Sequence, residues 1–263
     1  MTEETRNELH EELASLYIYE QTGEHPPKDI IIVVHDQLEL VKKCVISIYS
    51  VTTNFTLYIW DNDSMEPTRK FLETLAKEHD NIILVRNEEN IGFIQPNNEL
   101  ARIGKSPYII LLNSDTEVKK GWDMAMISWL QNHPECKQVG YQGGLLVEDG
   151  RGCSDPGYGH RIDYVSGWCF CVQRDTYNKY GLFDETNLEF AYGEDSDYSL
   201  RLREAGHAVY ALNLKMVDHV GNATSKEVAN ERDTSASFEK NHKYIRERHA
   251  AYLNDKRVLL NKG

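Results

Sequence analysis

The sequence has 263 residues, of which 40% are hydrophobic, so the chain can bury one sizeable core. Its formal net charge of -13 argues against a nucleic-acid partner, because phosphate contacts need clustered Lys and Arg. No stretch approaches the roughly 20 apolar residues that span a bilayer. The first residues also lack the basic-then-apolar order of a signal peptide. We therefore expect a cytoplasmic, globular protein with no transmembrane segment.

Apolar runs alternate with amphipathic stretches over the first half of the chain. The run at 30–34 is unbroken, as expected for a strand covered on both faces. After this run, the apolar residues Leu38, Val41, Val45 and Ile48 recur at spacings of three and four, which is typical of one face of a helix. Continued along the chain, this reading predicts strands at 30–34, 57–60, 82–85 and 108–112, and helices at 38–48, 67–75 and 95–103. The alternation predicts an α/β fold with a mostly parallel, twisted sheet and helices on both faces.

Polar residues follow all four predicted strands. They are His35-Asp36, Asp61-Asn62, the stretch 87–90 and Asn113-Ser114-Asp115. Such residues also favour ordinary turns, but four such endings on one edge of a parallel sheet indicate a ligand site. Neither a Gly-x-Gly-x-x-Gly after the first strand nor a P-loop pattern is present, which disfavours a nicotinamide dehydrogenase and a P-loop ATPase.

The five cysteines indicate neither a disulfide framework nor a zinc site. Their number is odd, and the sequence contains no Cys-x-x-Cys pair. Cys169 and Cys171 lie two residues apart in a strand-like run, so their side chains share one face. Small buried hydrophobic residues are common at such positions. We expect reduced thiols that pack in the core.

Seven short motifs between about Lys28 and about Thr224 together resemble the glycosyltransferase family 2 enzymes, especially their rhamnosyltransferase-like branch. In order they are Val33-Val34-His35-Asp36, Trp60-Asp61-Asn62-Asp63-Ser64, Asn90-Ile91-Gly92-Phe93 with Asn97-Asn98, Leu111-Leu112-Asn113-Ser114-Asp115-Thr116, Val165-Ser166-Gly167-Trp168, Gly181-Leu182-Phe183-Asp184-Glu185 and Glu194-Asp195-Ser196-Asp197. The resemblance implies the GT-A fold, in which a nucleotide-binding half is fused to an acceptor-binding half. We expect a helical extension at 1–27, the catalytic domain at 28–224 and a helical tail packed on it at 225–263.

The resemblance implies that Asp115 binds a divalent cation, Mn²⁺ or Mg²⁺, that bridges the phosphates of a nucleotide-sugar. A hard cation prefers carboxylate and phosphate oxygens and offsets the charge of the departing diphosphate. Asn113 and Ser114 stand where many relatives keep another Asp, so only one acid remains. His219 resembles the late His of such enzymes, and a neutral imidazole suits Mn²⁺ as a second ligand. The alternatives are a capping role for Asp115 and a hydrogen-bonded His219, with Asp218 as the nearest other ligand.

The resemblance places the nucleotide at the first two strand ends. Asp61 and Asn62 match the position where relatives hold a pyrimidine, and the Asn62 carbonyl can accept from the N3–H that uracil and thymine share. We expect His35 to pack on the base or ribose and Asp36 to contact the nucleoside, with turn formation as the alternative for both. The full set expected to bind the nucleotide-sugar is Val34, His35, Asp36, Asp61, Asn62, Asn90, Gly92, Asn113 and Ser114.

The second acidic cluster supplies the expected general base. Inverting sugar transfer needs a carboxylate that takes the proton of the acceptor hydroxyl, and we assign this role to Asp195, with Glu194 as its substitute. Residues 196–205 show helical spacing, so these acids fall at or before a first turn, where capping is the alternative role. The segments Ser166-Gly167-Trp168 and Tyr192-Gly193 resemble segments that face the sugar and the acceptor, and aromatic rings stack well on sugar C–H surfaces. Packing in the core is the alternative role of Trp168 and Tyr192.

The expected function is thus metal-assisted, inverting transfer of a sugar from a UDP- or dTDP-linked donor to a glycan or glycoconjugate, with rhamnose as the sugar that the resemblance favours. The alternative is a catalytically weak scaffold that binds nucleotide-sugars or glycans, suggested by the reduced acidic motif at 113–115. A nucleotidyltransferase would need a Gly-rich triphosphate loop, and 35–37 offers none. The amphipathic stretch 238–253 also allows dimerisation or peripheral contact with an acidic membrane surface.

Overall fold

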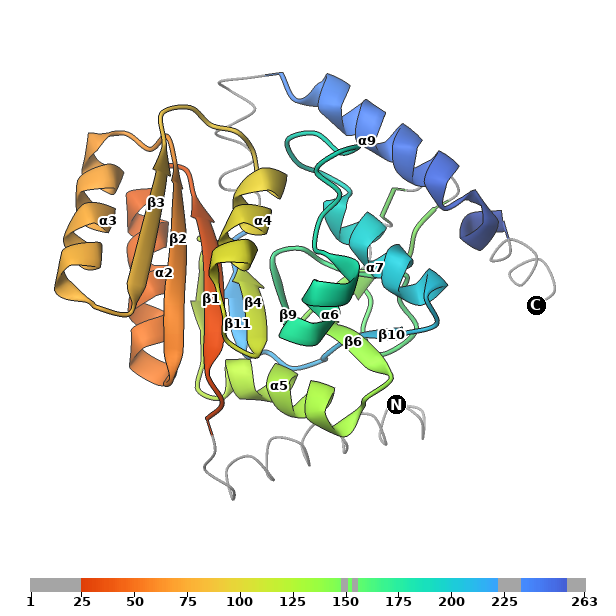
Figure 1. The fold of residues 1–263 in the computed structure, drawn as a ribbon, viewed down its shortest axis with the longest axis horizontal. Coiled ribbons are helices and arrows are strands. Elements are labelled where there is room, and N and C mark those ends of the chain that lie inside the picture. The colour runs from red at the N-terminus through yellow and green to blue at the C-terminus, as the bar shows by residue number, and fades with distance from the viewer. Residues whose placement is uncertain (1–24, 148–150, 153–155, 222–232, 255–263) are drawn as a thin grey trace.

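A seven-stranded mixed sheet forms the centre of the computed structural model (Figure 1). The structure describes residues 25–147, 151–152, 156–221 and 233–254. Of the extension expected at 1–27, only 25–27 lie within this part of the chain, and they are irregular. The described strands are Lys28–Val34 (β1), Phe55–Asn62 (β2), Ile82–Asn87 (β3), Tyr108–Leu112 (β4), Thr116–Val118 (β5), Cys136–Gly140 (β6), Gly143–Gly144 (β7), Tyr164–Val165 (β8), Cys169–Gln173 (β9), Ala208–Ala211 (β10) and Val217–His219 (β11).

Helices cover both faces of this sheet. They are Leu38–Val51 (α2), Glu66–Glu78 (α3), Ile94–Ile103 (α4), Trp122–Asn132 (α5), Arg174–Tyr180 (α6), Glu194–Glu204 (α7) and Ser235–Arg248 (α9). In β1, Ile30 and Ile32 pack with α2, α3 and α5, whereas Ile31 belongs to the core formed with α4, α7 and α9. This alternation follows from the two-residue period of a strand. Figure 1 shows the two helical layers on either side of the strands.

The order of the sheet, β10-β6-β9-β4-β1-β2-β3, positions the site. The chain runs outward from β1 through β2 to β3 and then returns to β4 on the other side of β1. The strand order therefore reverses between β1 and β4, which is where open α/β sheets bind ligands. Only β9 is antiparallel to its neighbours, β4 and β6, and the other four neighbouring pairs are parallel. The predicted α/β fold with a mostly parallel sheet is confirmed.

Several elements differ from the sequence expectation. The helix expected from Ser196 begins two residues earlier, at Glu194, so both acids lie inside its first turn. The sequence pattern does not predict α5, because every residue from Trp122 to Leu130 is buried and no polar face marks a helical period.

The cysteines within the described part of the chain pack as expected. Cys44, Cys136, Cys169 and Cys171 are free and buried, and burial raises the pKa of Cys44 and Cys136 to about 12. The part of the chain that the structure describes contains no helix long and apolar enough to cross a membrane.

Candidate active site

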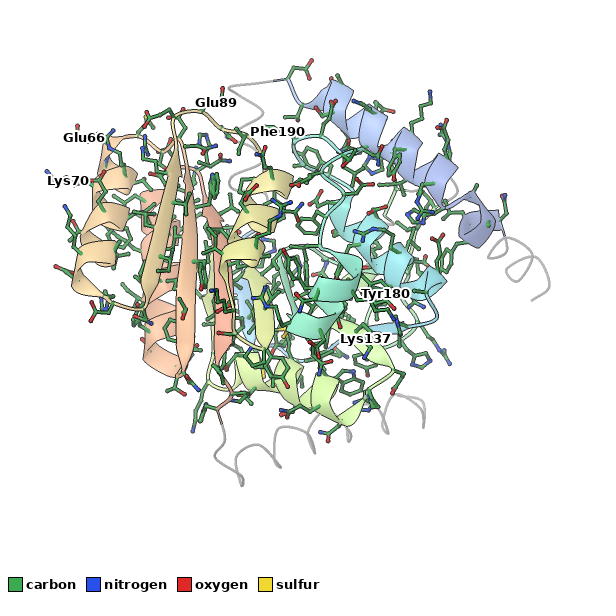
Figure 2. The ribbon with its side chains drawn as sticks, in the orientation of Figure 1. Glu66, Lys70, Glu89, Lys137, Tyr180 and Phe190 are labelled. Atoms are coloured by element: carbon green, nitrogen blue, oxygen red, sulfur yellow. The ribbon has the colours of Figure 1, made fainter. Side chains whose placement is uncertain are left out.

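One cavity, with a volume of about 300 Å³, lies at the carboxyl ends of β1, β2 and β4. Parallel strands end together at this edge, so motifs that are distant in sequence meet there. In Figure 2, Glu89, which follows β3, and Phe190, which lines the cavity, lie along this edge. Of the residues predicted for the site, the cavity is lined by His35, Asn62, Asn90, Gly92, Asn113, Ser114, Asp115, Gly167, Trp168, Tyr192, Glu194 and Asp195.

Asp115 and His219, the predicted metal ligands, lie side by side. Asp115 follows β4, and His219 ends β11, which pairs antiparallel with β5 so that His219 faces Thr116. The His219 Nε2 lies 3.1 Å from Asp115 Oδ1 and makes no hydrogen bond. The Trp168 ring stacks on the imidazole, with the ring centroids 4.8 Å apart. The pairing of two short strands therefore brings a carboxylate oxygen and an imidazole nitrogen close enough to share one cation.

The Asn62 side chain organises the nucleotide side of the cavity. Its Nδ2 donates to Asn90 Oδ1 at 2.7 Å and to the Gly92 carbonyl at 2.8 Å, and its Oδ1 accepts from the Ile91 N–H at 3.0 Å. The Asn62 main-chain carbonyl lies 2.9 Å from His35 Nδ1. Both amide hydrogens are engaged, while Oδ1 retains a second lone pair. The loop after β3 is thus tied to the end of β2.

Three residues predicted to bind the nucleotide do not line the cavity. Asp61 forms an ion pair with Arg86, and its Oδ1 accepts from the Ser64 N–H at 2.9 Å. Asp36 accepts from the Met65 N–H at 2.7 Å, so its carboxylate holds the turn before α3. Val34 is fully buried in the core. Asp36 and Asp61 thus bind neighbouring turns and Arg86, and Val34 packs in the core.

Glu194 and Asp195 start α7, directly after Gly193, which takes the N-cap position at φ 85°. Asp195 Oδ2 accepts from the Gly167 N–H at 3.0 Å, and Oδ1 accepts from the Ser196 N–H at 2.7 Å. Glu194 Oε2 is buried without a hydrogen-bond partner.

The two neighbouring carboxyls differ in their affinity for a proton. Burial, followed by the charge of Asp195, raises the pKa of Glu194 to about 8. Burial also raises the pKa of Asp195, but the hydrogen bonds from Gly167 and Ser196 oppose this and favour its ionised form. Of the two carboxyls, Glu194 is therefore the one that keeps a proton near neutral pH, whereas Asp195 has hydrogen-bond donors that stabilise its charged form.

Five further residues line the cavity, namely Val33, Phe93, Ser166, Phe190 and Ala191. The first three lie within the motifs that carry the resemblance, whereas sequence reasoning misses Phe190 and Ala191. Phe190 and Tyr192 adopt positive φ values of 59° and 78°, which residues other than glycine seldom do. The residue types at 190–192 do not predict this turn, and the adjacent Gly193 is the only residue there that favours one.

A family match covers the part of the chain that forms the first strands of the sheet. The model of the family described as glycosyl transferase family 2 matches residues 29–147, which contain β1 to β4 and Asp115. Over these residues the chain is similar to the family 2 glycosyltransferases, and the mostly parallel sheet agrees with that similarity.

Solved structures share the fold at low sequence identity. GalNAc-T7 with UDP, GalNAc and Mn²⁺ is 16% identical at a TM-score of 0.69, covering 88% of this chain and 50% of that one. Mannosyltransferase PcManGT from Pyrobaculum calidifontis, in complex with GDP-Man and Mn²⁺, is 12% identical at a TM-score of 0.57. The match covers 92% of this chain and 79% of that one. TarS 1–349 from S. aureus, in complex with UDP-GlcNAc, is 13% identical at a TM-score of 0.56. The match covers 73% of this chain and 57% of that one. The chain thus spans half the length of the GalNAc-T7 chain. No curated protein matches the sequence.

Proposed function

We propose that this chain transfers a sugar from a UDP- or dTDP-linked donor to a hydroxyl of a glycan or glycoconjugate, with inversion and with the help of a divalent metal. The observation that carries the proposal is a single cavity lined by Asp115, Glu194 and Asp195, with His219 beside Asp115 in a neighbouring pocket. Asp115 with His219 suits a metal-bound diphosphate, and the Glu194–Asp195 pair suits proton removal from the acceptor. We assign the catalytic domain to 28–224 and a helical tail to 225–263, of which the structure describes 233–254 with α9.

The residues present fit a divalent cation. Asp115 is buried at the cavity, and His219 Nε2 lies 3.1 Å from its carboxylate without a hydrogen bond of its own. No group of three or more His, Cys, Asp or Glu side chains in the described ranges is placed to hold a metal, so the protein would supply these two ligands. Mn²⁺ accepts both nitrogen and oxygen ligands, and diphosphate oxygens can complete the shell. When bound, the cation neutralises charge on the leaving diphosphate.

Asp195 is the proposed general base. Its carboxylate is held by the Gly167 and Ser196 N–H groups and lines the cavity, so it can accept the acceptor's hydroxyl proton as the hydroxyl attacks the anomeric carbon. Glu194 already carries a proton near neutral pH and therefore does not compete for this one.

The donor assignment rests on Asn62 and on the solved relatives. Asn62 Oδ1 keeps one lone pair that can accept from the N3–H of uracil or thymine. GalNAc-T7 and TarS were solved with uridine nucleotides, whereas PcManGT was solved with GDP-Man. The motif resemblance favours rhamnose as the sugar. Trp168 and Tyr192 line the cavity and would stack on its C–H faces.

The test is a thermal-shift screen of the wild-type chain against UDP-, dTDP- and GDP-sugars, each with and without Mn²⁺ or Mg²⁺. A ligand that binds only the folded state raises the melting temperature. We expect a rise with a uridine or thymidine donor that depends on metal in the wild type and is lost in Asp115→Asn. A donor that stabilises the chain but is neither hydrolysed nor transferred would favour the scaffold alternative. No shift with any donor would contradict the proposal.

A further inference from the structure

Asn241 of α9 holds the loop that forms one wall of the cavity. Its side chain is fully buried, and all its hydrogen bonds go to the main chain of 189–192. Oδ1 accepts from the Glu189 N–H at 2.9 Å, and Nδ2 donates to the carbonyls of Glu189, Ala191 and Tyr192 at 2.8, 2.9 and 3.0 Å. One side chain thus contacts four backbone groups of a loop that lies outside the helices and strands, with one of its two amide hydrogens shared between carbonyls.

The loop needs such support because its backbone is strained. Phe190 and Tyr192 have φ values of 59° and 78°, in the left-handed region that side chains disfavour. On its other side, the Phe190 carbonyl accepts from the N–H groups of Phe93 and Ile94, at 2.6 and 3.2 Å. The loop is therefore held between the start of α4 and Asn241.

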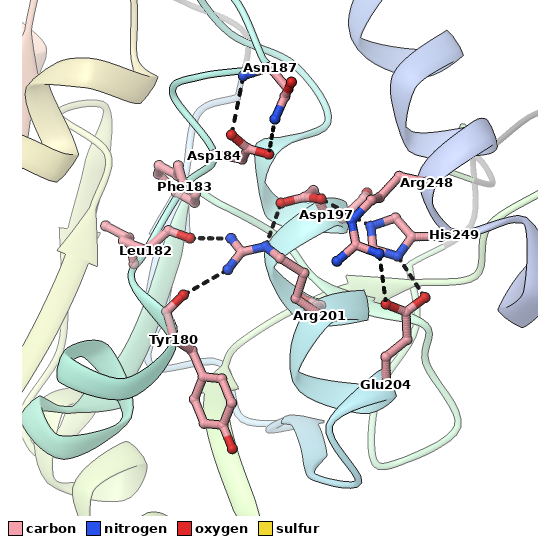
Figure 3. A network of polar contacts seen from close by, with 12 residues as sticks. Tyr180, Leu182, Phe183, Asp184, Asn187, Asp197, Arg201, Glu204, Arg248 and His249 are labelled. Atoms are coloured by element: carbon pink, nitrogen blue, oxygen red, sulfur yellow. Dashed lines mark hydrogen bonds and ion pairs between the residues drawn. The ribbon is translucent and has the colours of Figure 1, made fainter.

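The helix that carries Asn241 is fixed to α7 at a second point. His249, fully buried just after α9, has Nε2 at 3.0 Å from Asp197 Oδ1 and Nδ1 at 2.8 Å from Glu204 Oε1 (Figure 3). Ile245 packs over Gly193, where an added side chain would collide with it. These contacts place Asn241 rigidly relative to the first turn of α7.

We propose that Asn241 is a positioning residue for the transfer step: it sets the shape of the wall formed by 190–192 and, through it, the placement of Asp195 against the sugar and the acceptor. The inference rests on the proposed function. Phe190, Ala191 and Tyr192 line the cavity and lead directly into Glu194 and Asp195. The nucleotide side, at His35 and Asn62, is held by other contacts, so Asn241 acts on turnover and much less on nucleotide binding.

The test compares Asn241→Asp with the wild type in kcat and in calorimetric Kd for the nucleoside diphosphate. The carboxylate keeps the shape and the acceptor of Asn241 but cannot donate to the three carbonyls. We expect kcat to fall about 10- to 100-fold, because small misplacements at a reacting centre cost about that much, while Kd changes less than about threefold. Tyr244→Phe is the matched control: it removes a hydrogen bond from α9 to Asp184 without touching 189–193.

Turnover equal to the wild type's in a folded Asn241→Asp would overturn this inference alone, as would an equal loss of kcat in Tyr244→Phe. A wild type without turnover on any donor would overturn the proposed function and this inference with it. Should Asn241→Asp fail to fold, Phe238→Leu perturbs the same wall, since the Phe238 ring packs 5.6 Å from that of Tyr192. A kcat unchanged in that variant would then overturn the inference.

Discussion

At the scale of single residues, Asp195 is the side chain on which the proposed transfer most depends. It lines the cavity, and its carboxylate is held by main-chain donors. Asp195→Asn keeps the shape but removes the base, so we expect kcat to fall by about 10² to 10⁴, the usual contribution of a general base. The Kd of the nucleoside diphosphate should stay within about threefold. Steady-state transfer assays and calorimetry measure the two quantities, and unchanged turnover would exclude Asp195 from the mechanism.

Glu194 links the site to the pH dependence of stability. Its pKa in the folded protein is about 8, above the ordinary value of 4.5, because it is buried beside Asp195. Between these two values the folded state binds more protons than the unfolded state, so the free energy of unfolding falls as pH rises toward 8 and is flat above it. Glu194→Gln removes this term. Denaturant unfolding at pH 5 and pH 8 should show the wild type losing roughly 3 kcal/mol more than the variant. Parallel pH profiles for the two proteins would contradict the assignment.

The residues of the site were predictable to the extent that their role depends on where a strand ends. Asn113, Ser114 and Asp115 follow an apolar run, and the topology brings that run to the ligand edge. Asp61 also follows a strand-like run, yet its carboxylate forms an ion pair with Arg86 of β3. The sequence of β2 alone does not predict this pairing. Asn241 lies far along the chain from the loop it holds, and no local pattern distinguishes it from an exposed Asn.

At the scale of elements, the strands and helices that sequence periodicity predicts are those that face the core on one or two sides. The runs at 30–34 and 108–112 became β1 and β4, and the amphipathic stretch after β1 became α2. The antiparallel insertion of β9 between β4 and β6 is different, because it depends on which strands pair across long distances. The sequence of β9 predicts a strand, but it does not predict which strands will pair with it.

The attachment of α9 to α7 can be tested through His249. Each of its ring nitrogens lies within hydrogen-bond distance of a carboxylate oxygen, Nε2 near Asp197 and Nδ1 near Glu204. His249→Ala leaves the buried Asp197 with Arg201 as its remaining partner, and we expect a loss of about 3 kcal/mol in the free energy of unfolding. Arg248→Gln is the control, because the exposed Arg248 lies 3.7 Å from Glu204, and it should cost less than about 1 kcal/mol. Urea denaturation measures the free energy of unfolding of both variants. Equal losses in the two variants would contradict the role of His249 in attaching α9 to α7.

At the scale of the whole molecule, the two ends of the sheet have different tasks. The carboxyl ends of β1, β2 and β4 carry the cavity, which polar side chains line. The amino end of β1 instead carries buried ion pairs: Lys28 with Asp123 of α5 at 2.7 Å, and Asp29 with Arg174 of α6 at 2.6 Å. These pairs tie the first strand to helices on both faces of the sheet. Stability and activity should therefore be separable along the direction of the strands.

The Lys28–Asp123 pair provides the test of this separation. Both side chains are buried, with exposed fractions of 0% and 3%, so Lys28→Met leaves a buried, unpaired carboxylate and should cost about 3 to 5 kcal/mol. Adding Asp123→Leu removes the stranded charge, and the double variant should regain at least half of that loss, because a buried ion pair contributes little net stability over apolar packing. The exposed pair of Lys43 and Glu117, 3.9 Å apart, supplies the control, and Lys43→Met should cost less than about 1 kcal/mol. Guanidinium unfolding gives these values.

Turnover and nucleotide affinity of the folded double variant should match the wild type, since the pair lies at the end of β1 away from the cavity. A large loss of turnover in a stable double variant would contradict the separation of stability from activity along the strands.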